Sequence, residues 1–234
     1  MPVFQLGDTI YFPPPELARE DGLLAVGGDL SPERLLLAYQ MGIFPWYAAG
    51  DPILWWAPTP RLILNPREFH CSRSLQRELT RGIFKFTMDT AFRRVITACA
   101  EVRTKQQQPT WIDPAMIEAY CQLHDLGYAH SLECWQNDAL VGGLYGVSLG
   151  RVFFGESMFS RVANSSKASL AILARQLAAW NFDCIDCQMR TEHLISLGAK
   201  EIPGQEFFAM LQQSILRPDR RGTWELEFGH ILLC

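Results

Sequence analysis

Cys184 and Cys187 have the spacing of a thiol redox site or of half a zinc site. They lie in the largely apolar stretch 182–189, whose length and composition predict a short strand. Successive side chains of a strand point to opposite faces of its sheet. The two sulfurs would then point to opposite sides, where they cannot share a zinc ion or close an unstrained disulfide. We therefore interpret both cysteines as packing residues.

The same alternation places Asp186 and Gln188 on one face of this strand. A carboxylate and an amide in an otherwise apolar strand need polar partners, because buried polar groups without them are costly. Two interpretations stay open. The pair is structural and bonds a nearby loop, or it is aimed into a cleft at the end of the strand, where Asp186 orients the Gln188 amide.

A second carboxylate, Glu156, follows the apolar run 152–154 and also falls in a predicted inner strand. It forms a salt bridge with an arginine at the edge of the core, or it serves a functional site. Ser157 and Ser160 lie beside it, but neither belongs to a G-x-S-x-G motif with a placed histidine. They are weak candidates for a nucleophile.

The elements that must position these residues are predicted most clearly from residue 111 onward. Asp113 and Pro114 begin a helix that ends near Leu126, and Asn164 to Ser166 begin a long helix that ends near Trp180. Between them the pattern predicts a meander of strands over 128–135, 139–148 and 151–158 with a hairpin turn at 136–138. The strand 182–189, short helices near 191–197 and 204–216, and a strand-like tail complete the chain.

This order predicts an α+β fold with a mixed sheet, and it is the order of acyl-transferring GNAT-type domains. The first 60 residues are rich in proline and glycine turns, with one clear helix that Ser31 caps and Gly42 ends. Helices are also predicted near 72–81 and 90–102, followed by a polar loop at 104–109.

A coenzyme A site would suit this order of elements. Such a site needs a glycine-containing loop that opens the helix after the meander, where backbone N–H groups cradle a pyrophosphate. Residues 161–167 (RVANSSK) contain no glycine. The sequence therefore disfavours an acetyl-coenzyme A enzyme, and no phosphate-binding loop or dinucleotide motif replaces it.

The chain has 234 residues, 48% of them apolar and 20% charged, as is ordinary for a folded domain or two. Its apolar runs are too short to span a bilayer, and its first residues do not resemble a secretory signal, so we expect a cytoplasmic protein. The net charge is −4, yet residues 61–105 carry ten basic against four acidic side chains. Such a basic block predicts either an anion-binding surface or a solvated helix face.

Several long strings in the chain resemble the bacterial leucyl/phenylalanyl-tRNA–protein transferases. They are GLLAVGGDLSPERLLLAYQMGIFPW (22–46), DPILWWAPTPR (51–61), TWI (110–112), LVGGLYGV (140–147), FGESMFSR (154–161), SSKASL (165–170), and IDCQ with HLISLGA (185–199). Together they cover nearly the whole chain. Two places depart from the family pattern: the loop 106–109 (QQQP) lacks acidic residues and glycine, and Thr191 stands where asparagine is frequent.

The resemblance implies an enzyme that takes Leu or Phe, and Met less well, from its tRNA. Such an enzyme attaches the residue to the N-terminal Arg or Lys of an acceptor protein, which marks that protein for degradation by the N-degron route. It implies a small N-terminal α/β domain over 1–62 and a GNAT-like catalytic domain over 63–234. The resemblance further implies a monomer without metal or coenzyme, whose partners are Leu-tRNA, Phe-tRNA and the acceptor.

The residues that match the family's catalytic and pocket positions are Tyr39, Trp46, Trp111, Tyr120, Phe153, Glu156, Asp186 and Gln188. Asp186 and Gln188 are the expected catalytic pair, and the others are expected to bind substrate. We expect a tunnel lined by Leu144, Val147 and Phe153 to hold the side chain of Leu or Phe. Trp46 and Trp111 would stack on the terminal adenosine of the tRNA.

The proton of the attacking amine has two possible routes. The Gln188 carbonyl oxygen accepts a hydrogen bond from the amine, or a hydroxyl of the terminal tRNA ribose relays the proton. The basic block 61–105 would contact phosphates near the acceptor end of the tRNA. Two alternative functions stay open: a GNAT-type N-acetyltransferase and a tRNA-binding module without catalysis.

Overall fold

A computed structural model describes residues 3–105 and 111–227, and the side chains of 103–105 are outside this description. The predicted tail beyond residue 227 and most of the predicted loop at 104–109 lie outside the described residues. Within the described part, no helix is long and apolar enough to cross a membrane.

The N-terminal part is built on a four-stranded sheet of order β1-β2-β4-β3. Its strands are β1 (Phe4–Leu6), β2 (Leu23–Gly27), β3 (Phe44–Pro45) and β4 (Leu54–Trp56). The helix α1 (Pro32–Gln40) packs beside it, and the Ser31 side chain accepts a hydrogen bond from the Arg34 N–H, as the sequence predicts. A short 3-10 helix, η1 (Pro15–Leu17), lies between β1 and β2.

The larger part is a seven-stranded sheet of order β11-β5-β10-β9-β8-β7-β6. Its strands are β5 (Arg61–Leu64), β6 (Lys85–Met88), β7 (Ala129–Gln136), β8 (Ala139–Leu149), β9 (Val152–Ser160), β10 (Cys184–Asp186) and β11 (Lys200–Ile202). β9 and β10 pair in parallel, and the other neighbours are antiparallel. The prediction of an α+β fold with a mixed sheet and a small N-terminal part is confirmed.

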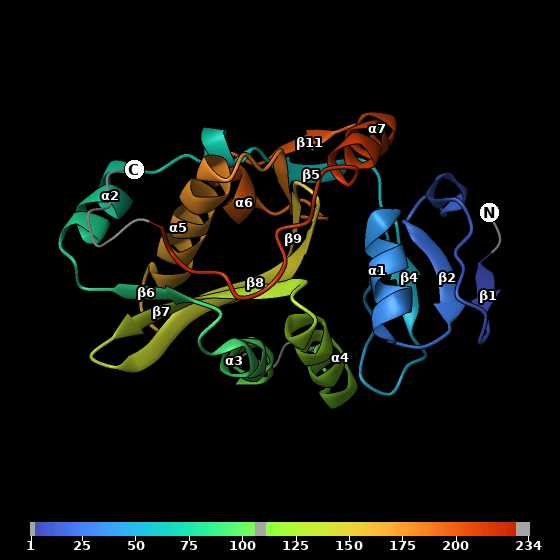
Figure 1. Cartoon of the computed structure of the whole chain (residues 1–234), viewed down its shortest axis with the longest axis horizontal. Helices are drawn as coiled ribbons and strands as arrows, with labels where there is room; N and C mark the ends of the chain where they lie inside the picture. The colour runs from blue at the N-terminus through green and yellow to red at the C-terminus, as the bar shows by residue number, and fades with distance from the viewer. Residues whose placement is uncertain (1–2, 106–110, 228–234) are drawn as a thin grey trace.

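Helices cover both faces of this sheet. They are α2 (Arg73–Thr80), α3 (Phe92–Lys105), α4 (Pro114–Asp125), α5 (Ser165–Ala179), α6 (Glu192–Ser196) and α7 (Gly204–Ser214), with the 3-10 helix η2 (Pro66–Glu68) after β5. Figure 1 shows α5 and α6 on one face, α3 and α4 on the other, and α1 with its sheet at one end of the molecule. One hydrophobic cluster joins the α3–α4 face to the N-terminal part, and a second lies beneath α5.

Several predicted elements are correct for the predicted reason. Asp113 caps α4 with its side chain, as predicted. The predicted helix near 72–81 is α2, and the structure adds that the Ser72 side chain caps it. The turn between β7 and β8 places Asn137 and Asp138 at φ 48° and 59°, the left-handed conformation that a two-residue hairpin requires. Asn164 stands at the N-cap of α5 with φ 63°, yet its side chain makes no capping bond.

Other predictions fail where strands are short. The strand predicted over 182–189 is only Cys184–Asp186, and β5, β6 and β11 were not predicted. The strand-like tail is wrong for its described part, because no strand follows α7 up to residue 227. The boundary predicted between residues 62 and 63 falls inside β5, which pairs with β10 and β11 of the larger sheet. The division at that residue stays a prediction.

Candidate active site

The candidate site lies where β10 leaves the parallel strand β9. Their pairing ends at Asp186 opposite Phe154, while β9 continues to Ser160. Two residues later Gln188 adopts φ 56°, a left-handed conformation that costs a residue with a side chain about 1–2 kcal/mol. Beyond Phe154, β9 no longer pairs with β10, and a cavity opens beside Gly155 and Glu156.

Asp186 forms a buried ion pair with Arg61 of β5. Arg61 donates from Nε to Oδ1 at 2.8 Å and from Nη2 to Oδ2 at 2.7 Å, and both side chains are no more than 1% exposed. The guanidinium also packs against the rings of Phe44 and Phe207, 5.0 and 4.7 Å from their centroids. The two partners depend on each other, because removing either one would leave a buried charge without compensation.

Asp186 positions Gln188 through the backbone and not, as the sequence predicts, through the side-chain amide. Because the strand ends at Asp186, the two side chains do not alternate along one strand face. Asp186 Oδ1 instead accepts a hydrogen bond from the backbone N–H of Gln188 at 3.0 Å. The side-chain amide of Gln188 donates from Nε2 to Glu156 Oε1 at 3.5 Å. Asp186 therefore fixes the backbone of Gln188, and Glu156 is the partner of its amide.

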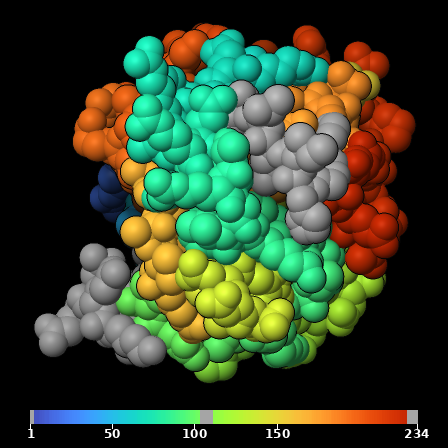
Figure 2. Space-filling view, turned by 90° about the vertical axis from the view of Figure 1, so that its left-hand side faces the viewer, coloured from blue at the N-terminus to red at the C-terminus, as the bar shows by residue number. Residues whose placement is uncertain are grey.

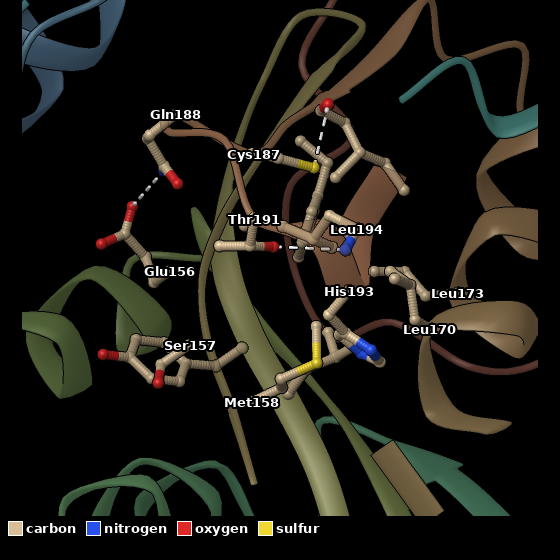
Figure 3. Close-up of a pocket in the computed structure, with 15 residues that line it drawn as sticks. Glu156, Ser157, Met158, Leu170, Leu173, Cys187, Gln188, Thr191, His193 and Leu194 are labelled. Atoms are coloured by element: carbon tan, nitrogen blue, oxygen red, sulfur yellow. Dashed lines mark hydrogen bonds between the residues drawn. The ribbon is translucent and has the colours of Figure 1, made fainter. Parts of the chain in front are cut away.

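Glu156 is positioned by a bulge in β9. Tyr145 pairs with Ser157 and Gly146 pairs with Gly155, so Glu156 has no partner on β8. A bulge of this kind re-aims side chains. Here it directs the carboxylate away from the ladder and toward Gln188, as Figure 3 shows.

Two buried tyrosines hold the other carboxylate oxygen of Glu156. Tyr120 of α4 donates to Glu156 Oε2 at 3.1 Å, and Tyr39 of α1 forms a short hydrogen bond with the Tyr120 hydroxyl. Burial raises the pKa of Glu156 to about 7, against the opposing effect of the tyrosine hydrogen bonds. Burial and the nearby Glu156 charge raise the pKa of Tyr39 and Tyr120 well above 10, so both stay protonated.

The cavity itself has a volume of about 290 Å³. Its apolar walls come from both sides of the β9–β10 opening, and Figure 3 shows them facing Glu156 and Gln188. The lining residues are Leu144, Tyr145, Phe153, Gly155, Glu156, Ser157, Met158, Leu170, Leu173, Ile185, Cys187, Gln188, Thr191, His193 and Leu194. An apolar pocket with a few polar groups at one edge fits a ligand that has an apolar side chain and a polar reacting end.

Most of the predicted site residues meet here. Leu144, Phe153, Glu156 and Gln188 line the cavity. Behind them, Tyr120 hydrogen bonds Glu156, Tyr39 hydrogen bonds Tyr120, and Asp186 accepts from the Gln188 N–H. Val147 does not line the cavity. It belongs to the cluster on the α3–α4 face, because it is three residues from Leu144 in β8 and so points to the opposite side.

The two tryptophans predicted to stack on the tRNA are not among the residues that line the cavity. Trp46 is 38% exposed and lies against Trp56, with 5.6 Å between ring centroids. Trp111 is 8% exposed and belongs to the hydrophobic cluster of the α3–α4 face. Only Trp46 of the pair presents a substantial surface for stacking, and the stacking role stays a prediction for both.

The cysteines of the C-x-x-C spacing point to different environments. Cys184 belongs to the cluster on the α3–α4 face, whereas Cys187 packs against the other cluster and lines the cavity. Both are free thiols, and burial raises the pKa of each. The opposite orientation predicted from strand alternation is confirmed.

The basic block 61–105 does not form a single surface. Arg61 is buried in the ion pair, Arg93 pairs with exposed Glu118, and Arg94 lies over the Trp135 ring. Three arginines remain exposed on one side of α2, at a spacing of four residues, and line a surface hollow: Arg73, Arg77 and Arg81. Figure 2 shows α2, in teal, on the face turned toward the viewer.

The sequence did not indicate the ion pair of Arg61 or that Thr191 and His193 line the cavity. Arg61 belongs to the basic block by sequence, although the apolar run 62–64 directly after it could have indicated a buried strand. Thr191 accepts a hydrogen bond from the Leu194 N–H at 3.2 Å and caps α6 while lining the cavity. The departure from the family pattern at residue 191 therefore falls at the site, and that at 106–109 lies outside the described residues.

Comparisons with known proteins give one family. A family model described as leucyl/phenylalanyl-tRNA protein transferase matches residues 63–212, and the model of the N-terminal domain of that family matches residues 28–59. A leucyl/phenylalanyl-tRNA–protein transferase of Desulfatibacillum aliphaticivorans is 59% identical over 97% of each chain. One of Desulforapulum autotrophicum is 55% identical over 96% of this chain and 98% of its own.

A further relative of the same name, from Legionella pneumophila, is 55% identical over 94% of this chain and 99% of its own. Among solved structures, "The structure of L-PGS from Bacillus licheniformis" aligns with a TM-score of 0.39 and 10% identity, over 74% of this chain and 57% of that one. That likeness is too low to support an inference about this chain.

Proposed function

This chain belongs to the leucyl/phenylalanyl-tRNA–protein transferase family, and from that premise we propose that it moves Leu or Phe from tRNA to the N-terminal Arg or Lys of acceptor proteins. The coarser activity, transfer of an aminoacyl group from tRNA to a protein, is the activity of the family. In the proposal Met is used less well, and the added residue marks the acceptor for degradation by the N-degron route. The observation that carries the proposal is the apolar cavity with Gln188 and Glu156 at its edge.

The apolar part of the cavity holds the side chain of the transferred amino acid. Leu144, Phe153, Leu170 and Leu173 surround a space that an unbranched Cβ enters easily. A residue that is branched at Cβ, such as Ile or Val, is broader at the entrance. One methyl group gives only about 1–3 kcal/mol of discrimination, so some use of Met is expected.

The tRNA binds mainly through phosphates near its acceptor end. Arg73, Arg77 and Arg81 supply exposed positive charge on α2. Such contacts position the substrate with little reading of its sequence, and they weaken as salt rises. Trp46 offers an exposed ring to the terminal adenosine, a stack worth about 1–3 kcal/mol.

The reacting amine of the acceptor lies at Gln188. An N-terminal amine has a pKa near 8, so about a tenth of it is neutral at pH 7 and can attack the ester. Gln188 donates its Nε2 hydrogen toward Glu156, which leaves its carbonyl oxygen to accept a hydrogen bond from the amine. Positioning of this kind removes up to about 7–11 kcal/mol of the barrier, and the ester is already activated, so neither ATP nor a metal enters the step.

The test uses tRNA charged with radiolabelled Leu and a casein-like acceptor with N-terminal Arg. Label in the acceptor supports the proposal. Label that stays on tRNA bound to the protein supports a tRNA-binding module, and acetylation of a small amine by acetyl-coenzyme A supports an N-acetyltransferase. Gln188→Ala is expected to lower transfer at least tenfold with unchanged tRNA binding, whereas Met189→Ala, at the exposed neighbouring position, is expected to transfer normally.

A further inference from the structure

We propose that Glu156 is the general base of the transfer: its carboxylate takes the proton that the acceptor amine loses, and returns it to the departing tRNA oxygen. This inference rests on the proposed function and assigns its proton route. It replaces both routes considered from the sequence, the Gln188 amide and a ribose hydroxyl of the tRNA.

The geometry leaves few other acceptors for this proton. Asp186 already receives three hydrogen bonds, two from Arg61 and one from the Gln188 N–H, and its side chain is 0% exposed. A neutral amide such as Gln188 is hardly basic. Among the described residues that line the cavity, Glu156 is the one carboxylate.

The position of Glu156 fits the task. Its Oε1 lies 3.5 Å from Gln188 Nε2, beside the place where the amine is held, and its Oε2 is bonded to Tyr120. The bulge in β9 frees it from sheet pairing and aims it into the opening. It therefore combines access from the cavity with a fixed orientation, the two requirements of a general base.

The charge of Glu156 depends on groups from every element around it. Burial, and the negative charge of Asp186 on β10, disfavour its ionised form, whereas the hydroxyls of Tyr39 on α1 and Tyr120 on α4 and the positive charge of Arg61 on β5 favour it. The balance gives Glu156 a pKa of about 7, near the working pH, where a general base is most effective.

The step balances in protons and electrons. The neutral amine nitrogen attacks the ester carbonyl carbon, a C–N bond forms, and the carbonyl electrons move to oxygen. Glu156 takes one N–H proton. The C–O bond to the 3′-oxygen of the tRNA then breaks, the carbonyl re-forms, and the protonated Glu156 gives its proton to that oxygen. The products are an amide and a free tRNA hydroxyl, with Glu156 again ionised.

The test measures single-turnover transfer from Leu-tRNA with enzyme in excess between pH 5.5 and 9, so that product release does not hide the chemical step. The wild-type rate is expected to rise through a pKa near 7 and again near 8, where the amine titrates. Glu156→Gln, which keeps the shape of the side chain, is expected to lose about 10²–10⁴-fold in rate and to lose the step near 7. Its KM for Leu-tRNA should change less than about threefold.

Two further variants keep the test decisive if Glu156→Gln does not fold. Glu156→Asp keeps a base at a greater distance and should retain the step near pH 7 with an intermediate rate. Tyr120→Phe removes a hydrogen bond that favours the ionised form, so the step should move to higher pH by about one unit. Glu118→Gln, an exposed change on the same helix as Tyr120, should leave rate and profile unchanged.

Some outcomes overturn the inference alone. One is a step near pH 7 in wild-type transfer that persists in Glu156→Gln. Another is a step that disappears in His193→Gln, which removes the histidine of the cavity wall. If Glu156→Gln raises KM for the acceptor without lowering the maximal rate, Glu156 only binds the cationic end of the acceptor. Absence of transfer by the wild type would instead overturn the proposed function, and the inference with it.

Discussion

Replacing Asp186 by Asn is expected to destabilise the protein strongly, although the two side chains have the same shape. Asp186 neutralises Arg61 through two hydrogen bonds in a site where both side chains are no more than 1% exposed. The amide cannot compensate the guanidinium charge, which would stay among the rings of Phe44 and Phe207. Removing one partner of a buried pair costs about 3–5 kcal/mol.

That cost is a large part of the roughly 5–15 kcal/mol by which folded proteins are stable. For a chain of this length each kcal/mol lowers the melting temperature by about 2–4 °C, so Asp186→Asn should melt about 6–20 °C below the wild type. Circular dichroism during heating measures this directly. Glu118→Gln is the matched control, because it breaks an ion pair whose side chains are 59% and 58% exposed and should cost less than about 1 kcal/mol.

The double variant Arg61→Met/Asp186→Leu separates stability from activity. It removes both charges and fills the site with apolar groups, so most of the stability should return. The backbone N–H of Gln188 would still lack its acceptor, and transfer should stay at least tenfold low. An Asp186→Asn protein that melts within about 2 °C of the wild type would refute the buried-charge reasoning. A double variant that recovers both stability and full transfer would refute the positioning role of Asp186.

Two further predictions concern the cavity and the C-terminal segment. Leu173→Phe narrows the apolar wall, so we expect transfer of Phe to fall about tenfold relative to Leu, measured as kcat/KM for the two charged tRNAs. His130 hydrogen bonds Asp89 at 2.8 Å and stacks on Trp224 at 3.7 Å, and burial lowers its pKa. An unfolded chain therefore binds more protons near pH 6.5, and the stability that neutral His130 contributes is present above that pH and lost as the pH falls below it. His130→Gln should lower the unfolding free energy by about 1–3 kcal/mol at pH 7.5, with a smaller difference from wild type at pH 5.5; a difference that does not shrink would contradict the assignment.

Local sequence signals predicted much of the scaffold because their physical causes are local. Ser31 and Asp113 each cap a helix with the side chain that the sequence offers at that position. Asn137 and Asp138 supply the left-handed turn of the hairpin between β7 and β8. Strand alternation also predicted correctly that Cys184 and Cys187 face different sides.

The short strands were not predicted because their formation depends on pairing with neighbouring strands. β5 has four residues and β11 three, too few for a periodic pattern, and they exist through pairing with β10 and with each other. The predicted strand at 182–189 was too long for a related reason. Gln188 turns out of the sheet, a departure that the apolar pattern around it does not reveal.

The sequence by itself determined which groups could do chemistry. Asp186, Gln188 and Glu156 stand out because polar side chains in apolar strands need partners, and the family strings support the same residues. Only the tertiary structure decided which partner each one has. Arg61 pairs with Asp186 across 125 positions of the chain, and Glu156 rather than Asp186 bonds the Gln188 amide. Hydrogen bonds and charge pairs act over a few ångströms of space, so chain folding, not spacing in sequence, sets what these carboxylates can do.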